Sequence, residues 1–163
     1  MDLYAIGLGC DRGTPADTVH TALLNALAEL GADIRQVMAV ASIDLKADEA
    51  ALLTLAGQYG WSMRFYRAAE LAEVPVPNPS EVVAKYTGTP SVSEAAALRV
   101  GAEYLSGLSS ANTENSLQAL PYMDMSFLVI EKYKWRGADG KNATVSIARL
   151  PMPHSVPMAA TPA

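Results

Sequence analysis

Residues 3–17 read LYAIGLGCDRGTPAD, and this stretch predicts the fold. Its first part, residues 3–8, is an apolar run typical of a buried strand, and residues 9–13 form a glycine-rich turn. Thr14 can cap a helix whose first position is Pro15, because a hydroxyl accepts from helix N–H groups and proline suits that position. A strand, a glycine turn and a capped helix together are the opening of an α/β unit.

The alternation of strand and helix continues along the chain. Residues 37–43 form a second apolar run, and Asp48 can cap the helix that follows and ends at Gly60. Ser91 and Glu94 match a capping box at the start of an alanine-rich helix. The other expected elements are a third strand at 62–66, a helical turn at 68–71, a short helix from Ser80 to Val83, the alanine-rich helix over 92–104, and two late strands at 127–130 and 143–148.

These elements predict a three-layer α/β/α domain around a mixed sheet of about five strands. Turn residues at 138–140 join the two late strands, so the sheet should end in an antiparallel hairpin. We expect a single domain over residues 1–150 and a flexible tail at 151–163, which is rich in proline and small residues. The polar residues 106–121 should form a loop.

Composition excludes several classes of function. The net charge of −5 argues against nucleic-acid binding, and no apolar run approaches the ~20 residues that span a bilayer. No signal-peptide pattern is present, so we expect a cytoplasmic protein. Cys10 is the only cysteine, and His20 and His154 are the only histidines. We therefore expect neither a disulfide, nor a metal site, nor another cofactor.

Ligands of such sheets bind beyond the carboxyl ends of the parallel strands, where the loops meet at one edge. Glycine turns and helix starts there expose N–H groups that can hold a phosphate or carboxylate. A rigid proline-rich loop, residues 74–79, should deliver polar groups to the same region. The candidate ligand-binding residues are Gly9, Cys10, Arg12, Gly13, Thr14, Asp44, Lys46, Asn78, Ser80, Thr89 and Ser91.

The same residues admit structural roles. The glycine turn is one residue too long for a dinucleotide-binding G-x-G-x-x-G motif, so it can also be a simple tight turn. Arg12 can bind a ligand carboxylate or form a surface ion pair. Asp44, Lys46 and Cys10 are the candidate catalytic residues, but Lys46 can instead pair with Asp44. A neighbouring arginine and helix start would lower the pKa of Cys10, although a buried apolar thiol is the alternative.

These motifs also resemble those of a known family. The matching segments, in the same order, are Gly7–Thr14, Ala41–Glu49, Val74–Ser80, Gly88–Leu98, Lys132–Lys134 and Asn142–Arg149. They resemble the CobE / CbiG C-terminal family of cobalamin-biosynthesis proteins. The resemblance implies a role in corrin-ring synthesis on a tetrapyrrole intermediate that has acetate and propionate carboxylates. Two departures are a longer loop at 106–121 and Glu131, where relatives tend to have proline.

The resemblance leaves three functional hypotheses. The first is a carrier or accessory factor that binds a corrinoid intermediate. The second is a hydrolase-type enzyme, because longer CbiG-type relatives open the ring-A lactone of a cobalt-precorrin. Those relatives have further domains ahead of this one, and since the first strand here begins at Leu3 we expect the standalone CobE type. The third is an accessory subunit that recognises another cobalamin-pathway enzyme, such as a methyltransferase.

Overall fold

A mixed sheet forms the centre of the protein. The computed structural model describes residues 1–81, 84, 91–108 and 120–152. Its strands are β1 (Tyr4–Cys10), β2 (Val37–Ile43), β3 (Arg64–Tyr66), β4 (Leu128–Arg136) and β5 (Asn142–Arg149). They form a 5-stranded sheet in the order β3-β2-β1-β5-β4. β1, β2 and β3 are parallel, whereas β5 is antiparallel to both β1 and β4. The predicted mixed sheet and its closing antiparallel hairpin are confirmed.

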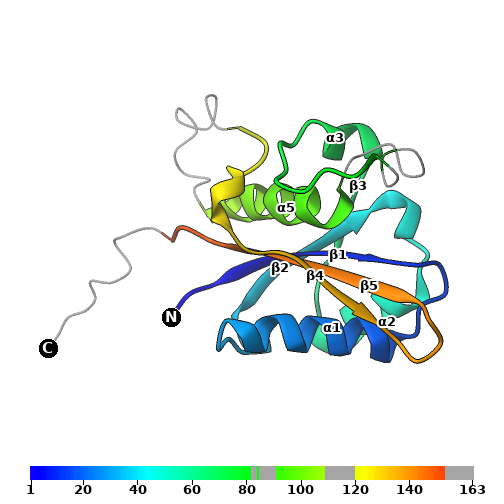
Figure 1. Ribbon diagram of the computed structural model, residues 1–163. Coiled ribbons are helices and arrows are strands. Elements are labelled where there is room, and N and C mark those ends of the chain that lie inside the picture. The colour runs from blue at the N-terminus through cyan, green and yellow to red at the C-terminus, as the bar shows by residue number, and fades with distance from the viewer. Residues whose placement is uncertain (82–83, 85–90, 109–119, 153–163) are drawn as a thin grey trace, which may run out of the picture.

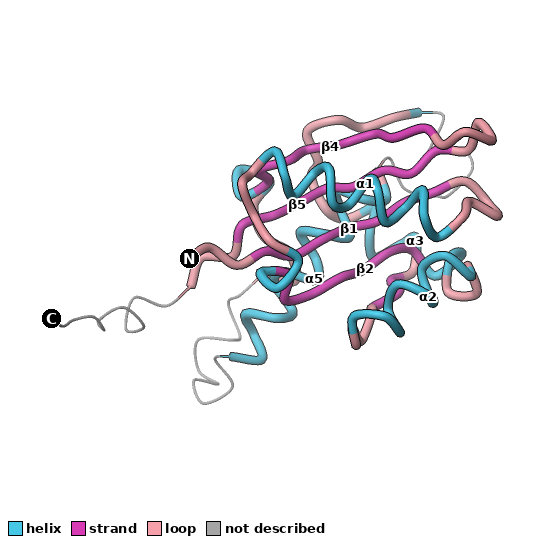
Figure 2. The backbone as a smooth tube through the Cα atoms, turned by 90° about the horizontal axis from the view of Figure 1, so that it is seen from below, coloured by secondary structure: helices cyan, strands magenta, loops and turns pink. Residues whose placement is uncertain are grey.

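Helices cover both faces of the sheet, as Figure 1 shows. The helices are α1 (Ala16–Glu29), α2 (Ala50–Tyr59), α3 (Ala68–Ala72) and α5 (Val92–Leu108), with 3₁₀ turns η1 (Ile34–Gln36), η2 (Asp44–Lys46) and η3 (Met125–Phe127). α1 and α2 lie on one face, seen toward the viewer in Figure 2, and α3 and α5 lie on the other. Within the described residues, no helix has the length and apolar character needed to cross a membrane.

Each face has its own apolar core, which explains why these segments form amphipathic helices. Leu23 of α1 and Leu52 of α2 pack with Ile6 on the first face. Leu71 of α3 and Leu98 of α5 form the second core with short side chains of β1 and β2. All four leucines are almost fully buried, and burial of each such side chain stabilises the folded protein by roughly 1.5–3 kcal/mol.

Two predicted helix caps are wrong, because other partners take the side chains. Thr14 is buried and donates its hydroxyl to the carbonyl of Asp11 at 2.6 Å, while Pro15 occupies the N-cap of α1 without a side-chain bond. Asp48 also does not cap α2; its carboxylate pairs with Arg12. A bond within its own turn engages Thr14, whereas a contact between two loops engages Asp48.

The predicted capping box at the start of α5 is wrong as well. Ser91 is buried and its hydroxyl has no hydrogen-bond partner within the described residues. Glu94 turns away from the helix start and accepts hydrogen bonds from Asn78. Glu94, which fits a local motif in the sequence, therefore contacts a residue 16 positions away instead.

Some element boundaries also differ from prediction. β4 extends to Arg136, because pairing with β5 continues along its charged half. α5 continues to Leu108, into the segment expected to be a loop. Four predicted features lie wholly or partly outside the described residues: Thr89, most of the loop at 106–121, half of the short helix at 80–83, and the tail from residue 153 onward.

Helix α5 approaches the sheet very closely at Gly7. A Cβ atom placed on Gly7 would lie 1.9 Å from the backbone oxygen of Ser93 in α5. α5 therefore lies directly on the bare backbone of β1. This contact positions the first turn of α5 near the carboxyl ends of β1 and β2.

We expect Gly7→Ala to destabilise the protein by about 2–3 kcal/mol, because the added methyl overlaps backbone atoms that cannot rotate away. Urea denaturation measures this free energy of unfolding. Gly57→Ala is the matched control, since Gly57 lies within α2 with nothing within 4 Å of its added Cβ. Gly57→Ala should instead stabilise the protein by up to about 1 kcal/mol, because alanine favours a helix more than glycine does. Equal effects of the two variants would contradict the close contact.

Candidate functional site

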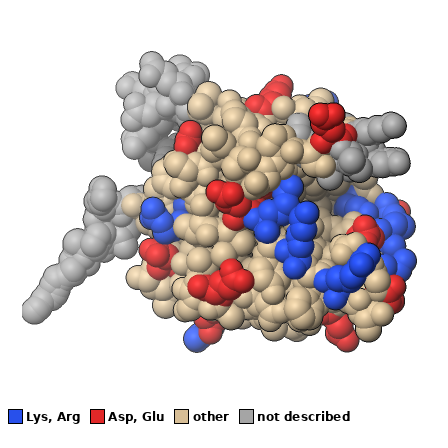
Figure 3. All heavy atoms as spheres, viewed as in Figure 1, with Lys and Arg blue, Asp and Glu red and all other residues tan. Residues whose placement is uncertain are grey.

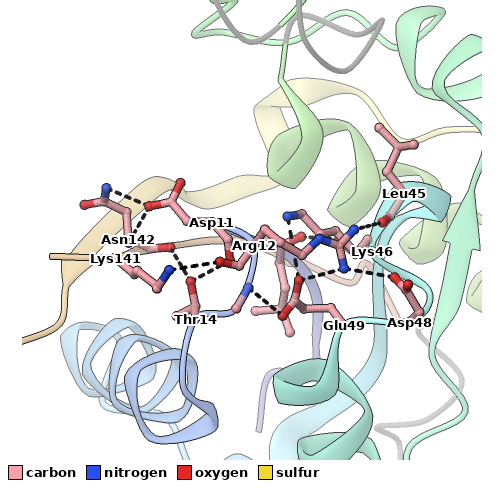
Figure 4. A network of polar contacts seen from close by, with 12 residues as sticks. Asp11, Arg12, Thr14, Leu45, Lys46, Asp48, Glu49, Lys141 and Asn142 are labelled. Carbon is pink, nitrogen blue, oxygen red and sulfur yellow. Dashed lines mark hydrogen bonds and ion pairs between the residues drawn. The ribbon is translucent and has the colours of Figure 1, made fainter. Parts of the chain in front are cut away.

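The loops after β1 and β2 meet at the edge formed by the carboxyl ends of the parallel strands, here called the carboxyl edge. Arg12, in the first loop, reaches across to the second loop (Figure 4). Its guanidinium donates to Asp48 Oδ1 at 2.9 Å and to the carbonyl of Leu45 at 2.7 Å. It also lies 3.1 Å from Glu49 Oε1. The strand topology thus brings residues from both predicted loops into one contact.

The charge of Arg12 is balanced within the protein. The side chain of Asp48 is 84% exposed, and its hydrogen bond with Arg12 lowers the pKa of this carboxyl group. The same bond raises the pKa of Arg12. Of the two roles considered for Arg12, the structure contains the ion pair, and contact with a ligand stays a prediction.

Glu49 is a buried acid at the centre of this contact. Its side chain is 3% exposed, and Oε2 accepts a hydrogen bond from the backbone N–H of Gly13 at 3.0 Å. Oε1 has no partner with hydrogen-bond geometry, but Arg12 lies at 3.1 Å and the Lys46 ammonium at 3.9 Å. A buried carboxylate requires such compensation. Glu49 therefore occupies the anion position that the glycine turn offers.

Two further amides in and beside the glycine turn are also engaged. Asp11 N donates to the carbonyl of Asn142, and Thr14 N donates to the carbonyl of Asp11. The ammonium of Lys141 lies 3.3 Å from the carbonyl of Arg12. The turn is thereby held against the start of β5, and its N–H groups at these positions are already satisfied.

Cys10 lies beside this cluster but points into the first core, where it packs as a partly buried side chain. Burial raises the pKa of the Cys10 thiol; Lys46 lowers it and Glu49 raises it, so the net shift is upward. This direction is opposite to the lowering expected from the sequence. At neutral pH the thiol is protonated, which reduces its reactivity as a nucleophile.

Asp44 and Lys46 lie in η2, directly after β2, but they do not pair with one another. Asp44 is exposed, and Lys46 reaches toward Glu49 instead. The leucine between them, Leu45, is 51% exposed. The carboxyl edge therefore presents to solvent an apolar side chain and a carboxylate, that of Asp44, which has no ion pair among the described residues.

A second polar group forms around Asn78, which ends the proline-rich loop. Its side-chain amide donates to Glu94 Oε2 at 2.6 Å and to Glu131 Oε1 at 3.1 Å. Its backbone N–H is 3.3 Å from Glu94 Oε1, and Lys132 donates to its carbonyl at 3.2 Å. Glu94 is fully buried in the first turn of α5, where the helix dipole favours a negative charge.

A surface hollow of about 450 Å³ adjoins Asn78 on the α5 face of the sheet. It is lined by Asn78, Pro79, Ser80, Glu131, Lys132 and Lys134. Figure 3 shows Lys and Arg side chains gathered across the front of the molecule, where β4 and β5 lie. The hollow thus joins the proline-rich loop to the basic half of β4.

The predicted site residues fall into two groups. Asn78 and Ser80 line the hollow. The larger group lies at the ends of β1 and β2 and consists of Gly9, Cys10, Arg12, Gly13, Thr14, Asp44 and Lys46. Ser91 is buried at the start of α5, and Thr89 lies outside the described residues. Sequence reasoning missed Glu49 and Glu94 as buried acids, because each fits an ordinary helix start. Among the described residues, no group of His, Cys, Asp and Glu is arranged to hold a metal.

Fold and site together define a three-layer α/β domain with charged loops at the carboxyl edge of a mixed sheet. The family model described as Cobalamin synthesis G C-terminus matches residues 4–148. The chain belongs to this family.

Curated relatives and a solved structure agree with this assignment. The chain is 42% identical over 123 residues to a protein named Cobalt-precorrin-5A hydrolase from Priestia megaterium, covering 74% of this chain and 33% of that protein. It is 46% identical over 99 residues to Protein CobE from Sinorhizobium sp, covering 60% of this chain and 64% of that protein. The chain therefore spans less than two thirds of both relatives. A crystal structure of CobE, a protein from the cobalamin (vitamin B12) biosynthetic pathway, matches with TM-score 0.70 and 32% identity, over 93% of this chain and 96% of that one.

We expect alkylation of Cys10 by iodoacetamide to be slower in the folded protein at pH 8 than in urea, because the raised pKa leaves less thiolate. The midpoint of the pH–rate profile should lie above the ordinary cysteine pKa of about 8.5. Lys46→Gln should move this midpoint further upward, because Lys46 lowers the pKa of Cys10. A midpoint below about pH 8 would contradict the burial of the thiol.

Asn78→Ala should destabilise the protein by about 2 kcal/mol, because it removes the amide that hydrogen-bonds the buried Glu94 carboxylate. The measurement is the free energy of unfolding in urea at neutral pH. In a Glu94→Gln background the same substitution should lower the free energy of unfolding by less, because burying an unpaired neutral amide is less unfavourable than burying an unpaired carboxylate. Equal costs in both backgrounds would show that the two residues are not coupled.

Proposed function

We propose that this protein binds a tetrapyrrole or corrinoid intermediate of cobalamin biosynthesis and acts as a carrier or accessory factor. The main support is the likeness over nearly the whole chain to CobE, a protein of that pathway. Family membership over residues 4–148 supports the same pathway. A cytoplasmic location and contacts with other enzymes of the pathway stay predictions from the sequence.

The geometry of the carboxyl edge suits a large ligand that is partly apolar and has several carboxylates. Leu45 offers an exposed apolar contact, and Lys132 and Lys134 border an open hollow. Ligands of open α/β sheets bind at this edge. The stiff proline-rich loop is fixed by Asn78, so little ordering should be needed when a ligand arrives.

A hydrolase-type reaction on a precorrin is the second candidate. The observation that favours it is the 42% identity to a protein named Cobalt-precorrin-5A hydrolase. Asp44 is the strongest of the catalytic candidates in this chain, because its carboxylate is exposed beside the end of β2. Lys46 reaches toward Glu49, and the raised pKa of Cys10 weakens its case as a nucleophile.

An absorbance titration of the purified protein with hydrogenobyrinic acid tests the proposal. We expect a saturable spectral change that is complete on mixing and stays constant with time. The urea-unfolded protein is the control for non-specific association. A spectrum that does not saturate, or that changes equally with unfolded protein, would contradict a folded corrinoid site.

The hydrolase candidate is tested by incubating the protein with cobalt-precorrin-5A and following the product mass. Turnover that is lost in Asp44→Asn, with binding retained, would favour the enzyme over the carrier. Asp44 is exposed, so this substitution should leave the fold intact.

A further inference from the structure

The cations of the protein divide into two groups by their partners. Six of the described Lys and Arg residues form ion pairs with carboxylates: Arg12, Arg35, Lys46, Arg64, Arg67 and Arg99. The cations of the β4–β5 hairpin do not. Within the described residues, the side chains of Lys132, Arg136 and Lys141 donate only to backbone carbonyls. The side chain of Lys134 has no hydrogen bond or ion pair among these residues. We call Lys132, Lys134, Arg136 and Lys141 the hairpin strip.

The register of the sheet places the strip at the carboxyl edge. Lys134 pairs with Thr144, which pairs with Gly9, and paired residues share one face of a sheet. Arg136 alternates onto the same side as Lys134. Lys132 follows a shift of register between Ile130 and Tyr133 but lines the same hollow as Lys134, and the three cations span about 13 Å along β4. That span is comparable with the width of a tetrapyrrole macrocycle.

The sheet surface beside the strip is open. α5 covers Gly7, but a Cβ atom on Gly9 would meet only Thr144, at 3.9 Å, among the described residues. The hollow at Lys132 and Lys134 continues this open surface toward the proline-rich loop. A flat ligand therefore has both room above the sheet and cations along one side.

The nearby acids reduce the positive charge of this surface but do not cancel it. Glu131 also lines the hollow, so its two lysines and one glutamate leave a net charge of +1. The carboxylate of Glu131 accepts from the Asn78 amide rather than forming an ion pair with either lysine. Glu94 is buried beneath Asn78, where its charge is shared with the start of α5.

We propose that the hairpin strip, rather than Arg12, binds the carboxylates of the ligand. This inference rests on the proposed function and names the surface that performs it. The whole protein has a net charge of −5 and repels anions, so binding requires local cations that are not already paired. Arg12 and Lys46 are neutralised by Asp48 and Glu49, whereas the cations of the strip have no ion pair within the part of the chain that the structure describes.

The experiment compares Lys132→Gln/Lys134→Gln with wild type in titrations with hydrogenobyrinic acid. We expect the double variant to bind about tenfold more weakly, because two ammonium–carboxylate contacts are lost. Arg149→Gln is the control for removal of a positive charge outside the strip. Arg149 is exposed and has no ion pair within the described residues, but it lies at the far end of β5, opposite Tyr4. Its removal should change affinity less than twofold, and circular dichroism checks the fold of each variant.

Glu131→Gln tests the inference in the opposite direction, because it should raise rather than lower the affinity for the ligand. Among the described residues that line the hollow, Glu131 alone is acidic; the substitution removes its charge, and glutamine still accepts a hydrogen bond from Asn78. Affinity for hydrogenobyrinic acid should therefore increase two- to fivefold at low ionic strength. The gain should diminish as salt is raised, because exposed charges are screened.

Unchanged affinity in the double lysine variant, or an equal loss in Arg149→Gln, would overturn the inference while leaving the proposed function intact. If wild type does not bind hydrogenobyrinic acid, the proposed function fails and the strip is tested with butane-1,2,3,4-tetracarboxylate by calorimetry. Binding of this probe that is lost in the double lysine variant would still support the strip. No binding of the probe to wild type would overturn it.

Discussion

The contact of α5 with the bare backbone of Gly7 is the constraint on which the rest of the site depends. Because glycine has no side chain, the helix approaches β1 far more closely than any other residue would permit. The first turn of α5 is then fixed near the carboxyl edge, with Glu94 buried against the loop that holds Asn78. The helix, the proline-rich loop and the hollow beside them take their positions from that one approach.

Two buried acids act in the same way at this edge. Glu49 precedes the first turn of α2, and its carboxylate accepts a hydrogen bond from the backbone N–H of Gly13. Glu94 lies in the first turn of α5, and its carboxylate accepts a hydrogen bond from the backbone N–H of Asn78. A carboxylate at a helix start is stabilised by the helix dipole, and each also satisfies a loop amide. The loops that carry the predicted ligand-binding residues are therefore fixed by acids of the protein itself. Pre-ordered loops reduce the entropy lost on binding.

Much of the fold could be predicted from the sequence, since apolar periodicity and glycine punctuation are local signals. The run at 37–43 and the turn at 138–140 are such signals, and both predicted elements are present. The three predicted caps fail for different reasons: Thr14 donates to Asp11 within its own turn, Ser91 has no partner within the described residues, and Asp48 pairs with the distant Arg12. The partner of Asp48 lies 36 residues away, which no local motif encodes. β4 was predicted too short because its second half is polar, and strand pairing rather than burial maintains it.

For the candidate site, the sequence indicated that the loops after β1 and β2 share one edge of the sheet, but not the state of their charges. Arg12 stood out as a charged residue within a glycine turn, yet its partners leave it neutralised. The Lys132–Lys134 segment matched the family pattern, but nothing local distinguishes a paired lysine from an unpaired one. That distinction depends on which acids the fold brings near, and so it requires the structure.

The difference between paired and unpaired cations also bears on the choice between carrier and enzyme. An exposed ammonium–carboxylate contact contributes only about 0–1 kcal/mol, so a ligand held by several of them can be released by losing them one at a time. A hydrolase instead needs an acid or base held within hydrogen-bond distance of the reacting group. Glu49 and Glu94 are held firmly, but each is bound to groups of the protein itself. Fixed acids that support the loops, beside lysines that line a surface hollow, are the arrangement expected of a surface that binds a polycarboxylate ligand and passes it on.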